Sequence, residues 1–391
     1  MKRLLQWAVR QHPDPFWNRK FLLRLTLTIC GLILLTDVLS NLWVFRYPNL
    51  LSTETIAGLT RPPTATHTAL VIVDPSDYAK YFQSQSPLNV GSLQSAVCAV
   101  LAHKPRVLVV DFDTSDPSFR SLTIPETGSH IIWARTVFSF RGETKIGDVL
   151  GSASTTMGQG FAVASRDPDG TVRSIPREIR LDGKWFNTLH WGAVSDYRAA
   201  LNGGHIPEFG SISRQTRSLD ATHLAADFQF RTYRLREFSP APRSCETLSP
   251  EALPDLSSDV VILGGQYDFA DIHATPFGGK WGVELLGIAI QSELSNEGMR
   301  HFPKLWKYFL KVVLGFVIGW LFTRLYATAA TLVVLLALIP MVLFGNLIAV
   351  LVLGYEGMVV PFTLGILIEQ LVTATEKAQH EQKKVETGLL H

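Results

Sequence analysis

Charged residues are scarce in this sequence. They make up 18% of its 391 residues, whereas a soluble globular protein carries about a quarter, so the deficit indicates lipid-facing sequence. The formal net charge is only +2, and there is no basic run or basic–aromatic pattern of the kind that binds nucleic acid. We therefore expect no nucleic-acid partner, and the length predicts two or three structural units.

Motifs for catalysis and metal binding are also missing. The three cysteines form no Cys-x-x-Cys pair, and no two histidines stand four residues apart as zinc ligands on a helix do. No Gly-x-Ser-x-Gly, Ser-x-x-Lys or Cys/His signature of a nucleophilic enzyme is present. The sequence therefore predicts no enzyme activity, no cofactor and no metal site.

The cysteines leave two alternatives open. Cys98 falls near the apolar face of a predicted helix and is expected to be a buried thiol. A Cys98–Cys245 disulfide is the alternative, which an oxidising compartment would permit. Cys30 lies within a long apolar run.

Four long apolar runs dominate what is present. They cover residues 21–45, 306–325, 327–353 and 358–374. Each is close to the roughly 20 residues that a helix needs to cross a bilayer, so we predict four transmembrane helices. A cleaved signal peptide is the rival for the first run, but its apolar stretch is long and no Ala-x-Ala-like site follows it. We interpret it as a retained anchor.

Basic residues indicate the orientation. Residues 1–20 carry five lysines and arginines against one acid, which predicts a cytoplasmic N-terminal tail. Residues 46–305 then form an extracytoplasmic domain, and three further crossings return residues 375–391 to the cytoplasm. Arg324 falls inside, as the rule prefers, whereas Lys304, Lys307 and Lys311 fall on the outer side.

Two charges inside the predicted spans are expected to meet. Asp37 and Lys311 both fall toward the outer leaflet, given a rise of about 1.5 Å per helical residue. An intramembrane acid is costly unless it is paired, so we predict an Asp37–Lys311 pair. The alternative is that each side chain reaches water on its own.

The extracytoplasmic region alternates strands and helices. Residues 69–74 and 106–113 are apolar strand-like runs on either side of an amphipathic helix at 91–103. This spacing predicts a βαβ unit. Further strands are predicted at 131–138, 159–164 and 258–265, and a helix at 282–297. We therefore expect an α/β domain whose mixed, partly parallel sheet is flanked by helices.

Two segments have a functional and a structural interpretation. Asp167-Pro-Asp169-Gly170 resembles a calcium loop, but its glycine falls too early for an EF-hand, so a hairpin turn is favoured. Gly264-Gly265 follows a strand, but no phosphate-binding motif continues from it. Neither segment therefore predicts a ligand.

Polar side chains gather where the predicted strands end. The candidate ligand-binding residues are Asp74, Asp111, Asp113, Asp271, His273 and Thr275. Because ligands of open α/β sheets bind at the carboxyl ends of the strands, these groups could hold a cation or a cationic ligand. The alternative is that the aspartates cap helices and that Thr275-Pro276 shapes a turn.

Four blocks of sequence carry a family resemblance. They are the strand ending at Asp74 and residues 104–113, 158–176 and 260–285. They resemble the type-two CHASE domain, an extracytoplasmic sensor module of bacterial receptors, over most of residues 35–375. The most specific block contains Asp271-Ile-His273-Ala-Thr275-Pro276. The resemblance implies one membrane helix before the sensor and three after it.

Two features depart from the family. The Trp-Pro-Trp-Pro-Arg stretch that usually follows the first strand is missing, since residues 83–92 contain neither Trp nor Arg. The family also typically continues into a cytoplasmic kinase, cyclase, phosphodiesterase or protease-like domain, and no such domain follows the fourth apolar run here. If the missing stretch helps to form a ligand site, sensing is altered.

The sequence favours a non-catalytic sensor of the bacterial inner membrane that relays a signal to a separate cytoplasmic protein. The alternative is a structural or scaffold subunit of a larger bacterial membrane protein complex. Both interpretations predict membrane lipid and another protein as partners and leave a homo-oligomer open.

Overall fold

A computed structural model describes residues 64–124, 128–140, 143–151, 158–202, 221–224, 226–238, 255–257 and 259–295, together with five isolated helical residues, Phe309, Val312, Val313, Val317 and Leu336. The chain divides into two units, Thr60–Gly298 and the two chain ends. No helix within the described residues is long and apolar enough to cross a membrane. Apart from those five residues, the four predicted spans lie outside the described residues, as does the Asp37–Lys311 pair.

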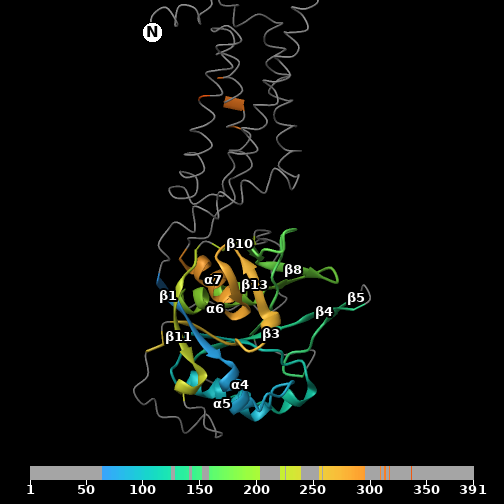
Figure 1. The fold of residues 1–391 in the computed structure, drawn as a ribbon, viewed down its shortest axis with the longest axis vertical. Coiled ribbons are helices and arrows are strands. Elements are labelled where there is room, and N and C mark those ends of the chain that lie inside the picture. Colours follow the sequence, from blue (N-terminus) through green and yellow to red (C-terminus); the bar gives the residue numbers. More distant parts are fainter. Residues whose placement is uncertain are drawn as a thin grey trace, which may run out of the picture. The chain divides into compact units, whose positions relative to one another are not determined.

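The centre of the domain is a six-stranded sheet in which every described pairing is parallel (Figure 1). In spatial order its strands are β11 (Gln229–Arg234), β1 (Thr64–Val73), β12 (Val260–Gly265), β2 (Val107–Asp111), β3 (His130–Arg135) and β6 (Gly158–Phe161). The neighbouring strands β12 and β2 and the second half of β1 are buried on both faces, which explains their unbroken apolar runs.

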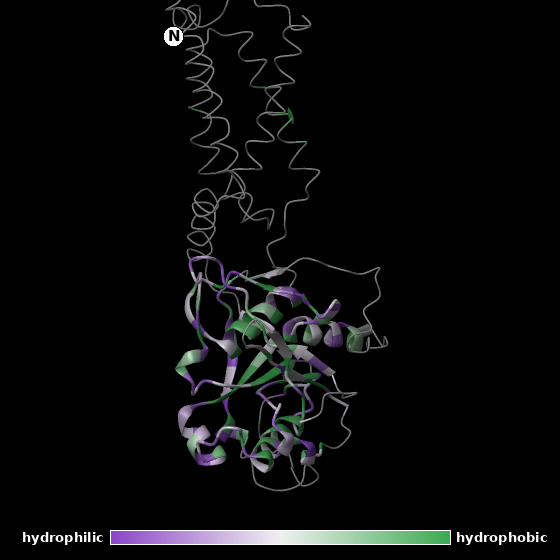
Figure 2. Cartoon of the chain, turned by 90° about the vertical axis from the view of Figure 1, so that its right-hand side faces the viewer, coloured by the Kyte–Doolittle hydropathy of each residue, from purple (hydrophilic) through white to green (hydrophobic). Residues whose placement is uncertain are grey.

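Helices cover both faces of this sheet. On one face α4 (Pro75–Phe82) and α5 (Val90–Leu101) pack with the short helices η1 (Pro117–Ser121) and η3 (Leu235–Phe238). On the other face lie α6 (Leu189–Asn202) and α7 (Gly282–Leu294). Successive strand residues alternate between the two cores, as Val71 and Ile72 do. Figure 2 shows the apolar strands enclosed between the two helical layers.

The described residues also form four two-stranded antiparallel sheets outside the main sheet. They are β4 (Val137–Phe140) with β5 (Glu143–Ile146), β7 (Ser174–Pro176) with β10 (Ala221–His223), β8 (Glu178–Leu181) with β9 (Lys184–Asn187), and β13 (Ile272–Thr275) with β14 (Gly278–Trp281). The helix η5 (Phe269–Asp271) precedes β13. A third apolar cluster lies among these outer strands and α7.

The prediction of an α/β domain is confirmed, and the sheet is more parallel than expected. The predicted βαβ unit exists as β1, α5 and β2, but β12 lies between its two strands. The predicted helix at 282–297 ends at Leu294, and the predicted strand at 131–138 divides between β3 and β4.

The turn at 167–170 is structural, as favoured. The Gly170 N–H donates to the Asp167 carbonyl at 2.8 Å, and Gly170 has a φ of +83°, which a glycine adopts without strain. Arg173 ion-pairs with both acids of the turn, at 3.0 Å from Asp167 and 2.7 Å from Asp169. Their carboxylates are therefore used inside the turn.

Cys98 corrects one expectation. It is buried on α5, as predicted, but it is disulfide-bonded rather than a free thiol. The other two cysteines of the chain lie outside the described residues.

Candidate functional site

The carboxyl ends of β1, β12 and β2 lie side by side. Val73 pairs with Gly265, and Gly264 pairs with Asp111, so Asp74 and Asp111 leave the sheet on either side of β12. This edge is where open α/β sheets usually bind ligands. We refer to Asp111, Asp271 and His273 as the edge cluster.

The edge cluster joins β2 to the segment that follows β12. His273 Nε2 lies 3.3 Å from Asp271 Oδ1, and Arg166 Nη2 lies 3.4 Å from His273 Nδ1. The pKa of Asp111 is raised to about 7, chiefly by burial and also by the nearby charge of Asp271, while His273 opposes the rise. Asp111 therefore changes its charge near neutral pH.

The first turn of α7 packs directly on this cluster. An added Cβ on Gly282 would lie 2.5 Å from both carboxylate oxygens of Asp271, and one on Gly264 would lie 2.8 Å from Val283. The backbone N–H of Trp281, the N-cap residue of α7, donates to the Glu284 carboxylate at 3.0 Å. These glycines allow the helix to approach both the sheet and the acid.

Two stacked tyrosines border the cluster. The rings of Tyr267 and Tyr78 lie 3.9 Å apart and 6° from parallel. Burial raises the pKa of Tyr267, and nearby Tyr78, Asp111 and Asp271 add to the rise. Tyr267 therefore keeps its phenolic proton.

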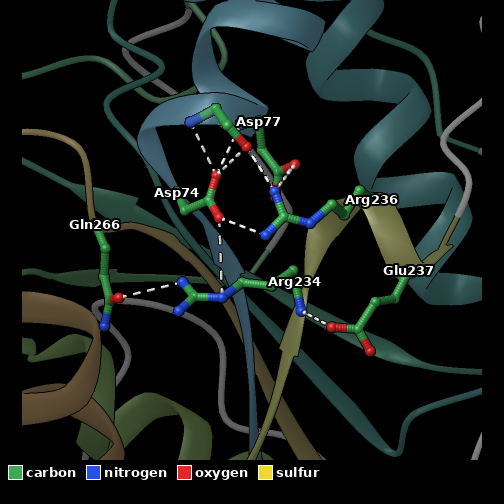
Figure 3. A network of polar contacts seen from close by, with 7 residues as sticks. Asp74, Asp77, Arg234, Arg236, Glu237 and Gln266 are labelled. Carbon is green, nitrogen blue, oxygen red and sulfur yellow. Dashed lines mark hydrogen bonds and ion pairs between the residues drawn. The ribbon is translucent and has the colours of Figure 1, made fainter.

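Asp74 belongs to a different network, shown in Figure 3. Its carboxylate accepts the Ser76 and Asp77 N–H groups at 2.9 Å and so caps α4. Its other oxygen lies 2.9 Å from Arg236 and 3.9 Å from Arg234. Partial burial works to raise the pKa of Asp74, but these hydrogen bonds and Arg236 hold it below its usual value.

The same network ties β11 to β12. The Arg234 guanidinium lies 3.5 Å from the side chain of Gln266, the residue after β12. The backbone N–H of Arg234 donates to the Glu237 carboxylate at 2.7 Å (Figure 3). Arg236 also lies 3.5 Å from Asp77, whose burial raises its pKa. The role of Asp74 here is that of a helix cap and ion-pair partner.

Asp113 and Thr275 have local partners too. Asp113 accepts the Ser115 N–H at 2.9 Å. The Thr275 hydroxyl donates to the Gly278 carbonyl at 2.7 Å and accepts the Phe277 N–H at 3.2 Å, which closes the β13–β14 hairpin. The structure thus brings Asp111, Asp271 and His273 together and uses Asp74, Asp113 and Thr275 as caps and turn residues.

Metal binding finds no support in the described residues, where no three His, Cys, Asp or Glu side chains are grouped so as to hold a metal ion. Within the edge cluster, His273 instead contacts Asp271, and Arg166 contacts the other ring nitrogen of His273. These contacts form a chain of polar groups from Arg166 through His273 to Asp271.

A second polar network was not anticipated from the sequence. Glu293, in the last turn of α7, accepts two hydrogen bonds from Arg177, at 2.8 and 3.0 Å, and one from Thr222. His190 bridges Thr222 and Thr188, at 2.8 and 3.1 Å. Burial, aided by Arg177, lowers the pKa of His190 to about 3, so this imidazole is neutral. The network fixes the end of α7.

The fold and the edge cluster together define a parallel α/β domain with a polar site at the carboxyl edge of its sheet. A family model described as the CHASE2 domain matches residues 27–324, and the chain belongs to this family. CHASE2 is a family of sensor domains. No curated protein and no solved structure matches the chain.

Proposed function

We propose that the protein is a membrane-anchored sensor whose α/β domain lies outside the cytoplasm and passes a signal to a separate cytoplasmic protein without catalysis of its own. The observation that carries this proposal is the extent of the family match. It spans the α/β domain and also most of the apolar runs at 21–45 and 306–325. A sensor domain flanked by such runs fits a receptor of the inner membrane.

Two further observations support the location. Four described residues of the second apolar run, Phe309, Val312, Val313 and Val317, are helical and exposed, with spacings that place them on one side of a helix. Exposed apolar side chains on a helix suit a lipid environment. The disulfide of Cys98 suits an oxidising compartment.

The edge cluster and α7 suggest how a signal would travel. The first turn of α7 contacts Asp271, and its last turn holds Glu293 against Arg177. Leu294 ends the helix, and the second apolar run begins shortly after it at residue 306. A change at the edge cluster would therefore act on the segment that enters the membrane.

Orientation can be tested with reporter fusions. Alkaline phosphatase fused after residue 300 should be active, because it would lie outside, whereas fusion after residue 326 should be inactive. The same two fusions made with a reporter that is active only in the cytoplasm should give the opposite result: inactive after residue 300 and active after residue 326. Activity only in the second fusion would overturn the orientation.

The relay can be tested by cross-linking the full-length chain in its native membrane and purifying it in mild detergent. A kinase, cyclase or phosphodiesterase should be recovered, and a variant that lacks residues 376–391 should lose it if the cytoplasmic tail provides the contact. Stoichiometric recovery of structural membrane proteins from both forms would favour the scaffold function instead.

A further inference from the structure

The two ends of the domain that continue toward the apolar runs lie side by side. The backbone N–H of His67, near the start of β1, donates to the side chain of Gln291, near the end of α7, at 3.4 Å. Eleven residues separate Leu294 from the apolar run that begins at residue 306. An extended chain of that length spans at most about 40 Å. This side of the domain is therefore the one that its tethers hold near a membrane.

The end of α6 belongs to the same side. The Tyr197 hydroxyl lies 3.3 Å from His67 Nδ1, and the Arg106 guanidinium, just before β2, lies 5.6 Å from the centre of the Tyr197 ring. Arg198 Nη2 donates to the Glu293 carbonyl, in the last turn of α7, at 2.7 Å. The starts of β1 and β2 and the ends of α6 and α7 therefore meet here.

Two guanidinium groups on this side lack an acidic partner. Arg106 faces an aromatic ring, and Arg198 bonds a main-chain carbonyl and lies 5.8 Å from the centre of the Trp191 ring. Neither is ion-paired with an acid in the part of the chain that the structure describes, and the same holds for the exposed Lys104. The two guanidinium groups are thus available to an external anion, and such groups hold phosphate oxygens through charge-assisted hydrogen bonds.

The acids on this side are largely neutralised by partners of their own. Glu293 is held by Arg177 at 2.8 Å, and the buried Asp259 is held by Arg231 at 2.7 Å. Asp255 is exposed just before β12, where its charge interacts with that of Arg231. The unpaired basic groups therefore outnumber the exposed acid, and this side carries a net positive charge.

An exposed apolar side chain stands beside these charges. Leu201, in the last turn of α6, is 54% exposed and follows Arg198 by three residues, so the two are neighbours on the helix surface. Asp196 is buried against β6 instead, where its carboxylate would lie 3.7 Å from a Cβ on Gly158. An apolar side chain flanked by arginine suits the surface of a bilayer, because it enters the acyl region while the guanidinium stays among the headgroups. We refer to Arg106, Arg198 and Leu201 as the tether edge.

The sequence after α7 continues the same charge. Residues 296–308 contain Arg300, Lys304 and Lys307 against the single acid Glu297. In the orientation proposed above these basic residues lie outside, where the positive-inside rule does not favour them. Basic residues beside a membrane are attracted to anionic lipid headgroups, which accounts for their position.

We propose that the tether edge is a docking surface for the anionic phospholipid headgroups of the membrane that anchors the chain, with Arg106 and Arg198 on the headgroups and Leu201 inserted beside them. This inference rests on the proposed membrane anchoring. Docking holds the ends of α6 and α7 against the bilayer and so orients the sensor relative to the apolar run that follows α7.

A tryptophan placed at residue 201 reports this contact. The full-length Leu201→Trp variant is reconstituted in nanodiscs of phosphatidylglycerol and phosphatidylcholine that include a lipid with a nitroxide on its headgroup. Comparison with the unsubstituted chain isolates the fluorescence of the new indole, which we expect to be quenched. Phe269→Trp is the matched control: Phe269 is 78% exposed in η5, beyond the carboxyl end of β12, and a tryptophan there should not be quenched.

Two changes test the role of charge. Nanodiscs of phosphatidylcholine alone should reduce the quenching, and this comparison stays valid even if an arginine variant fails to fold. Arg106→Gln combined with Arg198→Gln should reduce it too. Each basic residue at an anionic surface changes the ratio of docked to undocked protein about fivefold, so the loss of both should lower it about 25-fold. Arg120→Gln, which changes an exposed arginine of η1, is the control and should retain the quenching.

The outcomes are distinct. No quenching at residue 201, or equal quenching in the two lipid mixtures, would overturn the headgroup contact. Quenching that inorganic phosphate relieves at matched ionic strength would overturn it in favour of a soluble anion. The proposed anchoring would then keep its own test in the reporter fusions. Quenching that depends on anionic lipid, together with alkaline phosphatase activity only after residue 326, would support the contact and overturn the proposed orientation.

Discussion

Replacing Glu293 by glutamine should destabilise the domain strongly. Glu293 accepts two hydrogen bonds from Arg177, its side chain is only 8% exposed, and that of Arg177 is 24% exposed. Glutamine keeps the shape of the side chain but removes the negative charge that the Arg177 guanidinium faces in this pair. Removing one member of a buried pair costs about 3–5 kcal/mol, and the partial exposure of Arg177 places the expected loss near about 3 kcal/mol.

Thermal unfolding of the full-length chain in detergent, followed by near-ultraviolet circular dichroism, measures this loss. For a domain of this size, about 3 kcal/mol lowers the midpoint by roughly 6–12 °C. Arg177→Met should cost a similar amount. The double variant should lose less than the sum of the two single variants, because neither charge is then left unpaired.

The control is the Lys280–Asp227 pair. Its ions lie 2.7 Å apart, but the Asp227 side chain is 40% exposed. Asp227→Asn should therefore cost at most about 1 kcal/mol. If Glu293→Gln lowered the midpoint no more than Asp227→Asn does, the assignment of Glu293 as the anchor of α7 would be wrong.

Further predictions concern the edge cluster, the sheet and the disulfide. Folding raises the pKa of Asp111 from 3.8 to about 7, so the native state holds a proton that the unfolded chain releases, and wild-type stability should fall as pH rises through this window. Asp111→Asn should remove this fall, worth up to about 4 kcal/mol between pH 4 and pH 8 in urea unfolding; an unchanged slope would contradict the assignment. Gly160→Ala should cost about 1–3 kcal/mol in the same assay, because its Cβ would lie 2.6 Å from the backbone of the first residue of α6, whereas Gly128→Ala meets no atom within 4 Å and should be nearly neutral. Non-reducing peptide mapping should link Cys98 to Cys245, and a link from Cys98 to the cysteine of the first apolar run would refute this pairing.

The central strands were predictable because of their environment. β2, β12 and the second half of β1 are buried on both faces, and such strands appear in a sequence as short unbroken apolar runs. The edge strand β11 has an irregular pattern of exposure and was missed. The position of β12 between β1 and β2 was missed too, because local sequence carries no information on strand order.

The candidate site was predictable in composition but not in arrangement. Asp111 and Asp113 look equivalent in the sequence, yet β2 ends at Asp111, and only this residue remains beside the sheet. Arg166 reaches His273 across 107 residues, which no local pattern could indicate. Gly282 gave the clearest available signal, since a glycine at the start of a helix can mark close approach by another group.

The position of β12 has a consequence for how the protein is made. It is the last of the six strands along the chain, yet it joins β11–β1 to β2–β3–β6. Until residues 260–265 have been synthesised, the two halves have no strand in common, and each presents unpaired edges that can associate with other chains. Parallel pairing between distant segments also folds slowly. Biogenesis of this domain therefore depends on protecting an incomplete sheet for most of its synthesis, and chains truncated before residue 260 should aggregate.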